Sequence, residues 1–191
     1  GGTVDINTGT VLNTYGDRAM GIVAQSIGGG GGLGGTTDDE SIASISFDSV
    51  DGVSGSGGQV TVDLTSGYIT TRGDGSHAII AQSIGGGGGI GGDLSAATLD
   101  ASYINSDQAG VSGDGGVVDV TVGGAIQTQG DNAYGVIAQS IGGRGGLWGN
   151  DGVLHAGSVG GADGNSSTVN VTANANITSA GENSIGIFAQ S

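Results

Sequence analysis

The sequence predicts an all-β fold, a parallel β-solenoid, on three observations. The phrase Ala-Gln-Ser-Ile-Gly-Gly begins at Ala24, Ala81 and Ala138, and Ala-Gln-Ser returns at Ala189. These starting points lie 57, 57 and 51 residues apart. Short segments that alternate apolar and polar residues, and Gly-Asp turns, recur at the same places in each unit. Self-similarity at a nearly fixed period is typical of stacked architectures, in which each unit buries its apolar face against its neighbours.

Each unit contains three predicted strands and one predicted turn. Alternation of apolar and polar residues predicts a first strand at residues 4–6, 60–64, 118–122 and 169–171. A second short strand follows at residues 11–12, 68–70, 125–127 and 176–178. A turn comes next at 16–17, 73–74, 130–131 and 181–182, where glycine precedes an acidic residue that can bond the local backbone. The third strand carries the motif at 21–24, 78–81, 135–138 and 186–189.

The third strand is apolar at consecutive positions, as in Ile79-Ile80. A strand with one face in water would alternate, so the run predicts cover on both faces. We expect three strands to make one lap, with laps stacked about 4.8 Å apart through parallel backbone hydrogen bonds. An α-helical alternative fails because glycine interrupts every window. The predicted core of the repeat is Ile22, Ala24, Ile79, Ala81, Val136, Ala138, Ile187 and Ala189.

The chain is interpreted as a single repeat array over residues 1–191, and as a piece of a longer protein. Its units cover approximately 1–57, 58–114 and 115–166, with a partial unit at 167–191. One unit is longer than one lap of short strands needs. The remaining residues comprise a glycine run and a more variable section, which forms either a second lap or a lateral excursion.

The glycine runs occupy residues 28–35, 85–92 and 142–149, at the same place in each unit. One reading is a flexible loop, because glycine gains most from disorder. The alternative is order: extended polyglycine chains approach closely and bond one another through their backbones. We expect these runs to pack laterally and to cover the motif strand. The residues assigned to this layer are Gly28, Gly29, Gly30, Gly31, Gly32, Gly85, Gly86, Gly87, Gly88, Gly89, Gly142, Gly143, Gly145 and Gly146.

The charge excludes two kinds of partner. The chain has 18 acidic residues, only three basic ones and a net charge of -15. Nucleic-acid binding needs Lys and Arg on the phosphates, so we expect no nucleic-acid partner. The same charge argues against anionic membrane surfaces, and the length of the apolar stretches predicts no direct membrane insertion. A soluble, self-repelling polymer fits this composition.

Candidate chemical sites are few, and each has a structural alternative. Arg72-Gly73-Asp74 spells an integrin-binding tripeptide, but its last two residues stand at the turn position that recurs in every unit. His77 falls in a column that otherwise holds Met, Tyr and Ile, which predicts packing rather than metal binding; His155 is the second histidine. With two distant histidines and no cysteine, a zinc site is not expected. The scarcity of basic residues and the absence of catalytic motifs predict that the protein is not an enzyme.

Calcium is the one cation that the sequence could hold. Residues 88–93 match the start of a calcium-binding nonapeptide, with Asp93 at its acidic position, but Ser95 stands where an apolar residue is expected. Asp38, Asp39 and Glu40 form an acidic cluster that could bind calcium weakly through oxygen ligands, or could be a solvated loop. No cofactor is otherwise expected.

The pattern G-D-x-x-x-G-I-x-A-Q-S-I-G-G-G-G-G, clearest at residues 16–32 and 130–146, resembles the glycine-rich repeats of large autotransporter passenger domains of Gram-negative bacteria. The unit at 73–89 departs from it with Ala78 in a glycine slot. The resemblance implies a right-handed parallel β-helix, export to the cell surface or the extracellular space, and a role in adhesion, aggregation or biofilm. It implies no catalytic residue.

The expected function is therefore a structural and adhesive segment, a stiff β-solenoid stalk or fibre. Its expected partners are further copies of itself or cell-surface and matrix components. A glycan- or calcium-binding module on the same scaffold is the alternative, and an ice-binding protein is a third, although no regular Thr-x-Thr array lines one face. An uncapped solenoid also has two open ends, which predicts end-to-end stacking.

Overall fold

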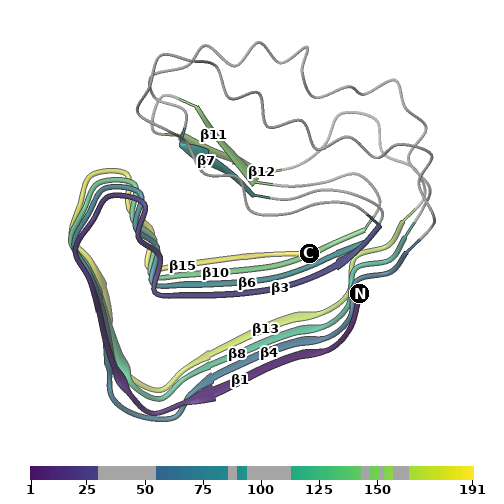
Figure 1. The fold of residues 1–191 in the computed structure, drawn as a ribbon, viewed down its shortest axis with the longest axis horizontal. Helices are drawn as coiled ribbons and strands as arrows, with labels where there is room; N and C mark the ends of the chain where they lie inside the picture. The colour runs from purple at the N-terminus through teal and green to yellow at the C-terminus, as the bar shows by residue number, and fades with distance from the viewer. Residues whose placement is uncertain (30–54, 86–89, 94–112, 143–146, 151–152, 157–163) are drawn as a thin grey trace.

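A computed structural model describes residues 1–29, 55–85, 90–93, 113–142, 147–150, 153–156 and 164–191. These residues are all-β, with no helix, and so contain no helix that could cross a membrane. Twelve of their strands form three four-stranded sheets in which every pairing is parallel. Figure 1 shows the strands stacked as successive layers of one winding, consistent with the predicted β-solenoid.

The first sheet alternates between core and solvent. It has the order β1-β4-β8-β13, and in β4 and β8 every second residue is buried. Valine and leucine occupy the buried positions, while threonine and aspartate occupy the outward ones, as the period of two in the sequence predicts. Its strands are β1 (Val4–Thr8), β4 (Val60–Leu64), β8 (Val118–Val122) and β13 (Val169–Ala173).

The strands of the second sheet are shorter than those of the first. The third sheet is built from the Ala-Gln-Ser segments and is called the motif sheet below. The second sheet contains β2 (Val11–Thr14), β5 (Tyr68–Thr71), β9 (Ala125–Thr128) and β14 (Ile177–Ser179). The motif sheet contains β3 (Ile22–Gly28), β6 (Ile79–Gly85), β10 (Val136–Ile141) and β15 (Ile187–Gln190). One strand of each sheet, with the turns between them, makes one lap.

The register places equivalent residues directly over one another. Ile22 pairs with Ile79, Ile79 with Val136, and Val136 with Ile187. The alanines of the motif pair in the same way, from Ala24 through Ala81 and Ala138 to Ala189. The eight predicted core residues therefore form two continuous columns, and those in the middle laps are inaccessible to solvent.

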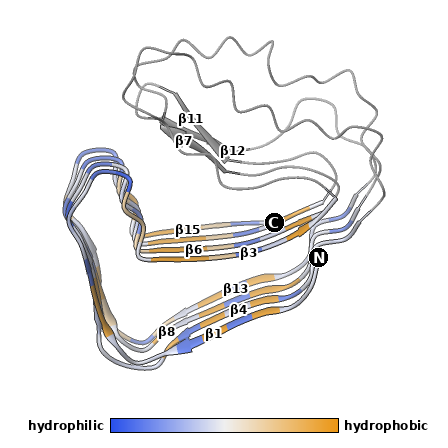
Figure 2. Ribbon diagram, in the orientation of Figure 1, coloured by the Kyte–Doolittle hydropathy of each residue, from blue (hydrophilic) through white to orange (hydrophobic). Residues whose placement is uncertain are grey.

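The main core lies inside the winding, where aliphatic side chains of all three lap sheets pack together across successive laps. A second apolar cluster, built around Ile80, Tyr134 and Ile137, lies on the opposite side of the motif strands. Ile79 and Ile80 are both fully buried, so the prediction that the motif strand is covered on both faces is confirmed. Figure 2 shows apolar and hydrophilic residues alternating along the strands of the first sheet, and hydrophilic residues at the turn that precedes the motif sheet.

The structure departs from the sequence prediction in two respects. The motif strands β3 and β6 are seven residues long and extend through Gly28 and Gly85, so the glycine runs begin inside the strands. A separate three-stranded sheet contains β7 (Ile90–Asp93), β11 (Leu147–Asn150) and β12 (Val153–Ala156). The last two pair antiparallel, because the two residues that separate them are too few for a parallel crossover. These strands join none of the lap sheets, which favours the lateral excursion over a second lap.

Candidate functional site

The serine of the motif closes each lap onto itself and onto the next one. The Ser83 hydroxyl donates to the carbonyl of Gly58, at the start of its own lap, with an O···O distance of 2.7 Å. It also accepts from the amide of Gly116, at the start of the following lap, at 2.8 Å. Ser26 makes the corresponding pair of bonds, to the Gly2 carbonyl and from the Gly58 amide. The serine therefore satisfies backbone groups at the corner where no sheet connects the strands.

The glutamine of the motif forms a ladder along the axis. The Nε2 of Gln25 donates to Oε1 of Gln82 at 2.7 Å, and Gln82 donates to Gln139 at 2.9 Å. Gln139 then donates to Gln190 at 2.6 Å. Gln82 and Gln139 are completely buried, on the outer side of the motif sheet. Buried amides are costly unless they are bonded, so this ladder favours a single register between laps.

The acidic residue of each turn forms a second ladder. The Asp17 carboxylate accepts the backbone amide of Asp74 at 3.0 Å, and the Asp74 carboxylate accepts the amide of Asp131 at 2.9 Å. The Asp131 carboxylate accepts the amide of Glu182 at 2.7 Å. The expectation that these side chains bond the local backbone was wrong, because their partner lies in the neighbouring lap. The described residues contain no group of three potential metal ligands.

His77 acts as a hydrogen-bond acceptor within the turn column. Its Nδ1 accepts the backbone amide of Tyr134 at 3.0 Å, and the two rings meet edge to face with centroids 5.3 Å apart. Burial lowers the pKa of His77 from 6.5 to about 4, because the charged imidazolium would lose its hydration. His77 is therefore neutral at pH 7 and packs beside the second apolar cluster. Of His155 the structure places only the backbone, in β12.

The Arg72-Gly73-Asp74 tripeptide belongs to the stacked turns. A Cβ atom added at Gly73 would lie 2.2 Å from the carbonyl oxygen of Gly16, so this turn is in backbone contact with the turn of the preceding lap. The Arg72 guanidinium lies over the ring of Tyr15, 4.6 Å from its centroid. Asp74 bonds the next lap. The geometry favours the structural reading of this tripeptide over integrin recognition.

Glycines stand where the chain leaves and re-enters each lap. A Cβ atom at Gly85 would lie 2.1 Å from the carbonyl oxygen of Gly113, and one at Gly28 would lie 2.2 Å from that of Gly55. The outgoing motif strand and the incoming segment therefore cross at backbone contact. This explains the glycine that follows Ala-Gln-Ser-Ile in the first two units.

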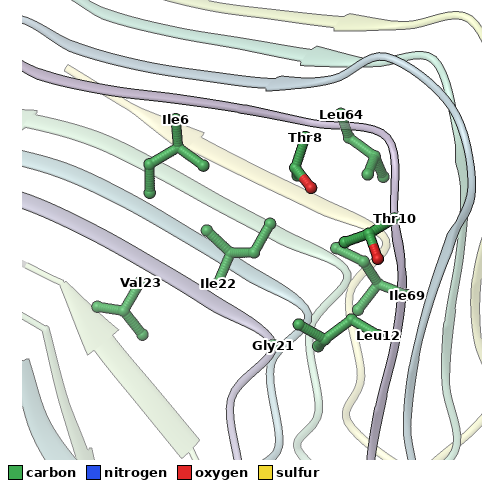
Figure 3. A pocket seen from close by; sticks show the side chains of 9 residues that line it. All are labelled: Ile6, Thr8, Thr10, Leu12, Gly21, Ile22, Val23, Leu64 and Ile69. Atoms are coloured by element: carbon green, nitrogen blue, oxygen red, sulfur yellow. The ribbon is translucent and has the colours of Figure 1, made fainter.

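A hollow of about 310 Å³ opens at the N-terminal end of the solenoid, inside the first lap (Figure 3). Its walls are mainly aliphatic, with hydroxyl and glycine positions between them, and none of its lining residues is ionisable. In the middle laps the equivalent space is filled by core side chains. The lining residues are Ile6, Thr8, Thr10, Leu12, Gly21, Ile22, Val23, Leu64 and Ile69.

The structure describes some of the predicted site residues and not others. Gly28 and Gly85 lie in motif strands, Gly29 and Gly142 directly follow them, and Asp93 ends β7. Asp38, Asp39 and Glu40 lie outside the described residues. So do Gly30, Gly31, Gly32, Gly86, Gly87, Gly88, Gly89, Gly143, Gly145 and Gly146.

No protein-family description, curated protein or solved structure matched the chain in three comparisons.

Proposed function

We propose that this chain is a structural and adhesive segment of an extracellular or bacterial cell-surface protein. In this proposal the solenoid is a right-handed parallel β-helix built from repeats of about 57 residues. It acts as a stiff stalk or fibre whose repeated faces make many individually weak contacts, with further copies or with surface and matrix components.

The observation that carries this proposal is the continuity of side-chain ladders along the axis. Backbone pairing, the buried glutamine ladder and the acidic ladder each run through all four laps. Three parallel sets of bonds resist bending in different directions, which suits a load-bearing rod. In contrast, the one hollow described above is apolar and without ionisable groups.

We also propose that the glycine runs pack laterally against the outer side of the motif sheet. Support comes from the burial of this side in the middle laps, where Ile80, Gln82 and Gln139 are inaccessible to solvent. The crossings at Gly28 and Gly85 send the chain out of the lap next to that surface. Glycine segments, which lack side chains, could approach a ladder of amides closely.

The rod proposal is tested by measuring length against the number of laps. The chain and its tandem duplicate and triplicate would be imaged by atomic force microscopy and measured by small-angle scattering. A stacked rod should lengthen linearly, by about 4.8 Å for each lap. Growth with the square root of residue number, as in a flexible chain, would contradict the proposal. Adding calcium or a chelator is expected to leave both the length and the unfolding curve unchanged.

The adhesive part of the proposal needs a separate assay. The chain would be displayed on a non-aggregating bacterial strain, and the rate at which cells settle or attach to a surface would be measured. Faster settling or attachment than cells carrying a charge-matched disordered segment is expected. Equal rates would leave a rod without adhesive activity and would overturn this part alone.

A further inference from the structure

The outward side of the second sheet differs in charge from the other exposed faces. The outward positions of the first sheet carry Asp5, Asp63 and Asp119, and the turns carry the acidic ladder. The described strands of the second sheet carry no carboxylate at all. In a chain with a net charge of -15, this face is where a partner meets the least negative field.

Two tyrosines stand at opposite edges of this face. Tyr68 begins β5 and is 46% exposed, and Tyr15, which follows β2, is 72% exposed. The Arg72 guanidinium packs on the ring of Tyr15 and so restrains it. Rigid, exposed aromatic rings of this kind supply contact area at low entropic cost.

Polar, uncharged side chains occupy one outward position of every strand, between the two rings in the first two laps and beyond them in the last two. Asn13, Thr70, Gln127 and Thr178 follow one another in register across the four strands. Asn13, Gln127 and Thr178 are exposed, whereas Thr70 is only 6% exposed. The accessible part of this row is therefore two amides and one hydroxyl, and adjacent strands of the sheet are about 4.8 Å apart. Such groups donate and accept hydrogen bonds without favouring either charge. Figure 1 shows this sheet as the left-hand wall of the winding, with no other described segment over its outer side.

The size of the face limits what can occupy it. Four strands of about four residues cover about 200 Å². A stable protein interface buries about 800 Å² on each partner. The flat patch in this chain is therefore too small for a protein dimer, but it suits a narrow, extended ligand.

We propose that the outward side of the second sheet binds an extended neutral polysaccharide. The sugar rings stack on Tyr15 and Tyr68, and their hydroxyl groups bond the exposed side chains of Asn13, Gln127 and Thr178. This inference rests on the proposed adhesive function and names the class of partner for it. An acidic polysaccharide is disfavoured, because the surrounding carboxylates repel it at low salt.

The test measures retention of the chain on insoluble cellulose, curdlan and mannan, with soluble polygalacturonate as the acidic counterpart in affinity electrophoresis. The unaltered chain should be retained on at least one neutral polysaccharide and not retarded by polygalacturonate. The double variant Tyr15→Ala/Tyr68→Ala should bind at least tenfold more weakly. The control Asp5→Asn/Asp119→Asn, on the first sheet, should bind as the unaltered chain does.

Retention on none of the three neutral polysaccharides, or equal retention of the tyrosine double variant, would overturn the inference. Binding to polygalacturonate alone would do so as well. Circular dichroism checks folding, and Tyr15→Phe/Tyr68→Phe, which keeps both rings, should retain most of the affinity if the alanine variant fails to fold. The cell-settling assay separates the two proposals. If cells that display the chain settle faster than the control cells but the chain binds no polysaccharide, only this inference is overturned. If neither faster settling nor polysaccharide binding is observed, the adhesive function is overturned as well.

Discussion

The three residues of the Ala-Gln-Ser motif have separate physical tasks. Alanine faces the main core, where Ala81 and Ala138 leave room for the larger side chains of the first sheet. Glutamine bonds its copies above and below on the other side of the strand. Serine joins the ends of the lap. A different residue in any of the three positions would remove a contact that each lap needs.

Removing one serine should therefore destabilise the whole stack. Ser83→Ala leaves the partly buried Gly116 amide without its acceptor and the Gly58 carbonyl without its donor. We expect a loss of about 2 kcal/mol in the free energy of unfolding. Urea unfolding followed by circular dichroism measures it. Ser66→Ala is the matched control, because Ser66 is exposed and its hydroxyl makes only a 3.4 Å bond to Gly9; it should change stability by less than about 0.5 kcal/mol.

The buried histidine predicts a specific pH dependence. The pKa of His77 is about 4 in the folded chain and 6.5 in the unfolded one, so the unfolded chain binds more protons between these values. The contribution of neutral His77 to the free energy of unfolding is complete above pH 6.5 and is lost as the pH falls toward 4. The loss is about 2 kcal/mol between pH 7 and pH 5. His77→Met introduces the residue found at Met20 and should remove that part of the slope. If the free energies of unfolding of the two proteins differed by the same amount at pH 7 and at pH 5, the assignment would be contradicted.

At the scale of the element, contact between turns in successive laps requires glycine. A Cβ atom added at Gly130 would lie 2.0 Å from the carbonyl oxygen of Gly73, and one at Gly181 would lie 2.0 Å from that of Gly130. At Gly16, which begins the column, the nearest atom would be 3.9 Å away. The glycine of the turn therefore has open space beside it in the first lap and a backbone carbonyl against it in the later laps.

This difference gives a matched pair of substitutions. Gly130→Ala should cost at least about 3 kcal/mol, because a backbone carbonyl cannot move aside within a hydrogen-bonded stack. Gly16→Ala should be neutral or slightly stabilising, since it restricts only the unfolded chain. Thermal unfolding of both variants measures the difference. Similar losses for both would mean that the turns do not stack at this distance.

The sequence was sufficient to predict the strands of a lap, because period-two alternation and the recurring turns are local signals. It also predicted burial on both faces of the motif strand, from the apolar pair at Ile79 and Ile80. It did not predict that Gln82 and Asp74 bond their copies in the next lap, since a contact between laps depends on register rather than on neighbours in the chain. The constancy of glutamine in the motif was the available signal. The antiparallel pairing of β11 with β12 was also missed, although it is local; the available signal was Asp151-Gly152, a dipeptide typical of two-residue hairpin turns.

For the whole molecule, the two ends are geometrically complementary. The edge strands β1, β2 and β3 are the equivalents of β13, β14 and β15, at the opposite edges of the same sheets. Gln190 accepts from Gln139, as Gln82 accepts from Gln25, so the ladder has one direction throughout. A second copy added in the same direction would continue every ladder and fill the hollow of the first lap.

The chain as it stands should accordingly associate head to tail at high concentration. Sedimentation velocity should show mass increasing with concentration, and more strongly at high salt, which screens the net negative charge. Leu12→Glu, which places a carboxylate in the hollow, should shift the chain toward the monomer. Val11→Glu is the control, because the neighbouring side chain points outward and is 50% exposed. A strictly monomeric unaltered chain would contradict this expectation.

The spacing between paired strands also bears on how such a molecule tolerates change. Residues paired between β6 and β10 are 57 positions apart, while those paired between β10 and β15 are 51 apart, and the alignment of the motif is the same in both cases. The connection between laps therefore differs in length by six residues, and the register of the motif strands is the same. The stretch between residues 142 and 164 is thus a suitable place to insert a foreign peptide. The same place in each lap of the scaffold could carry a different insert.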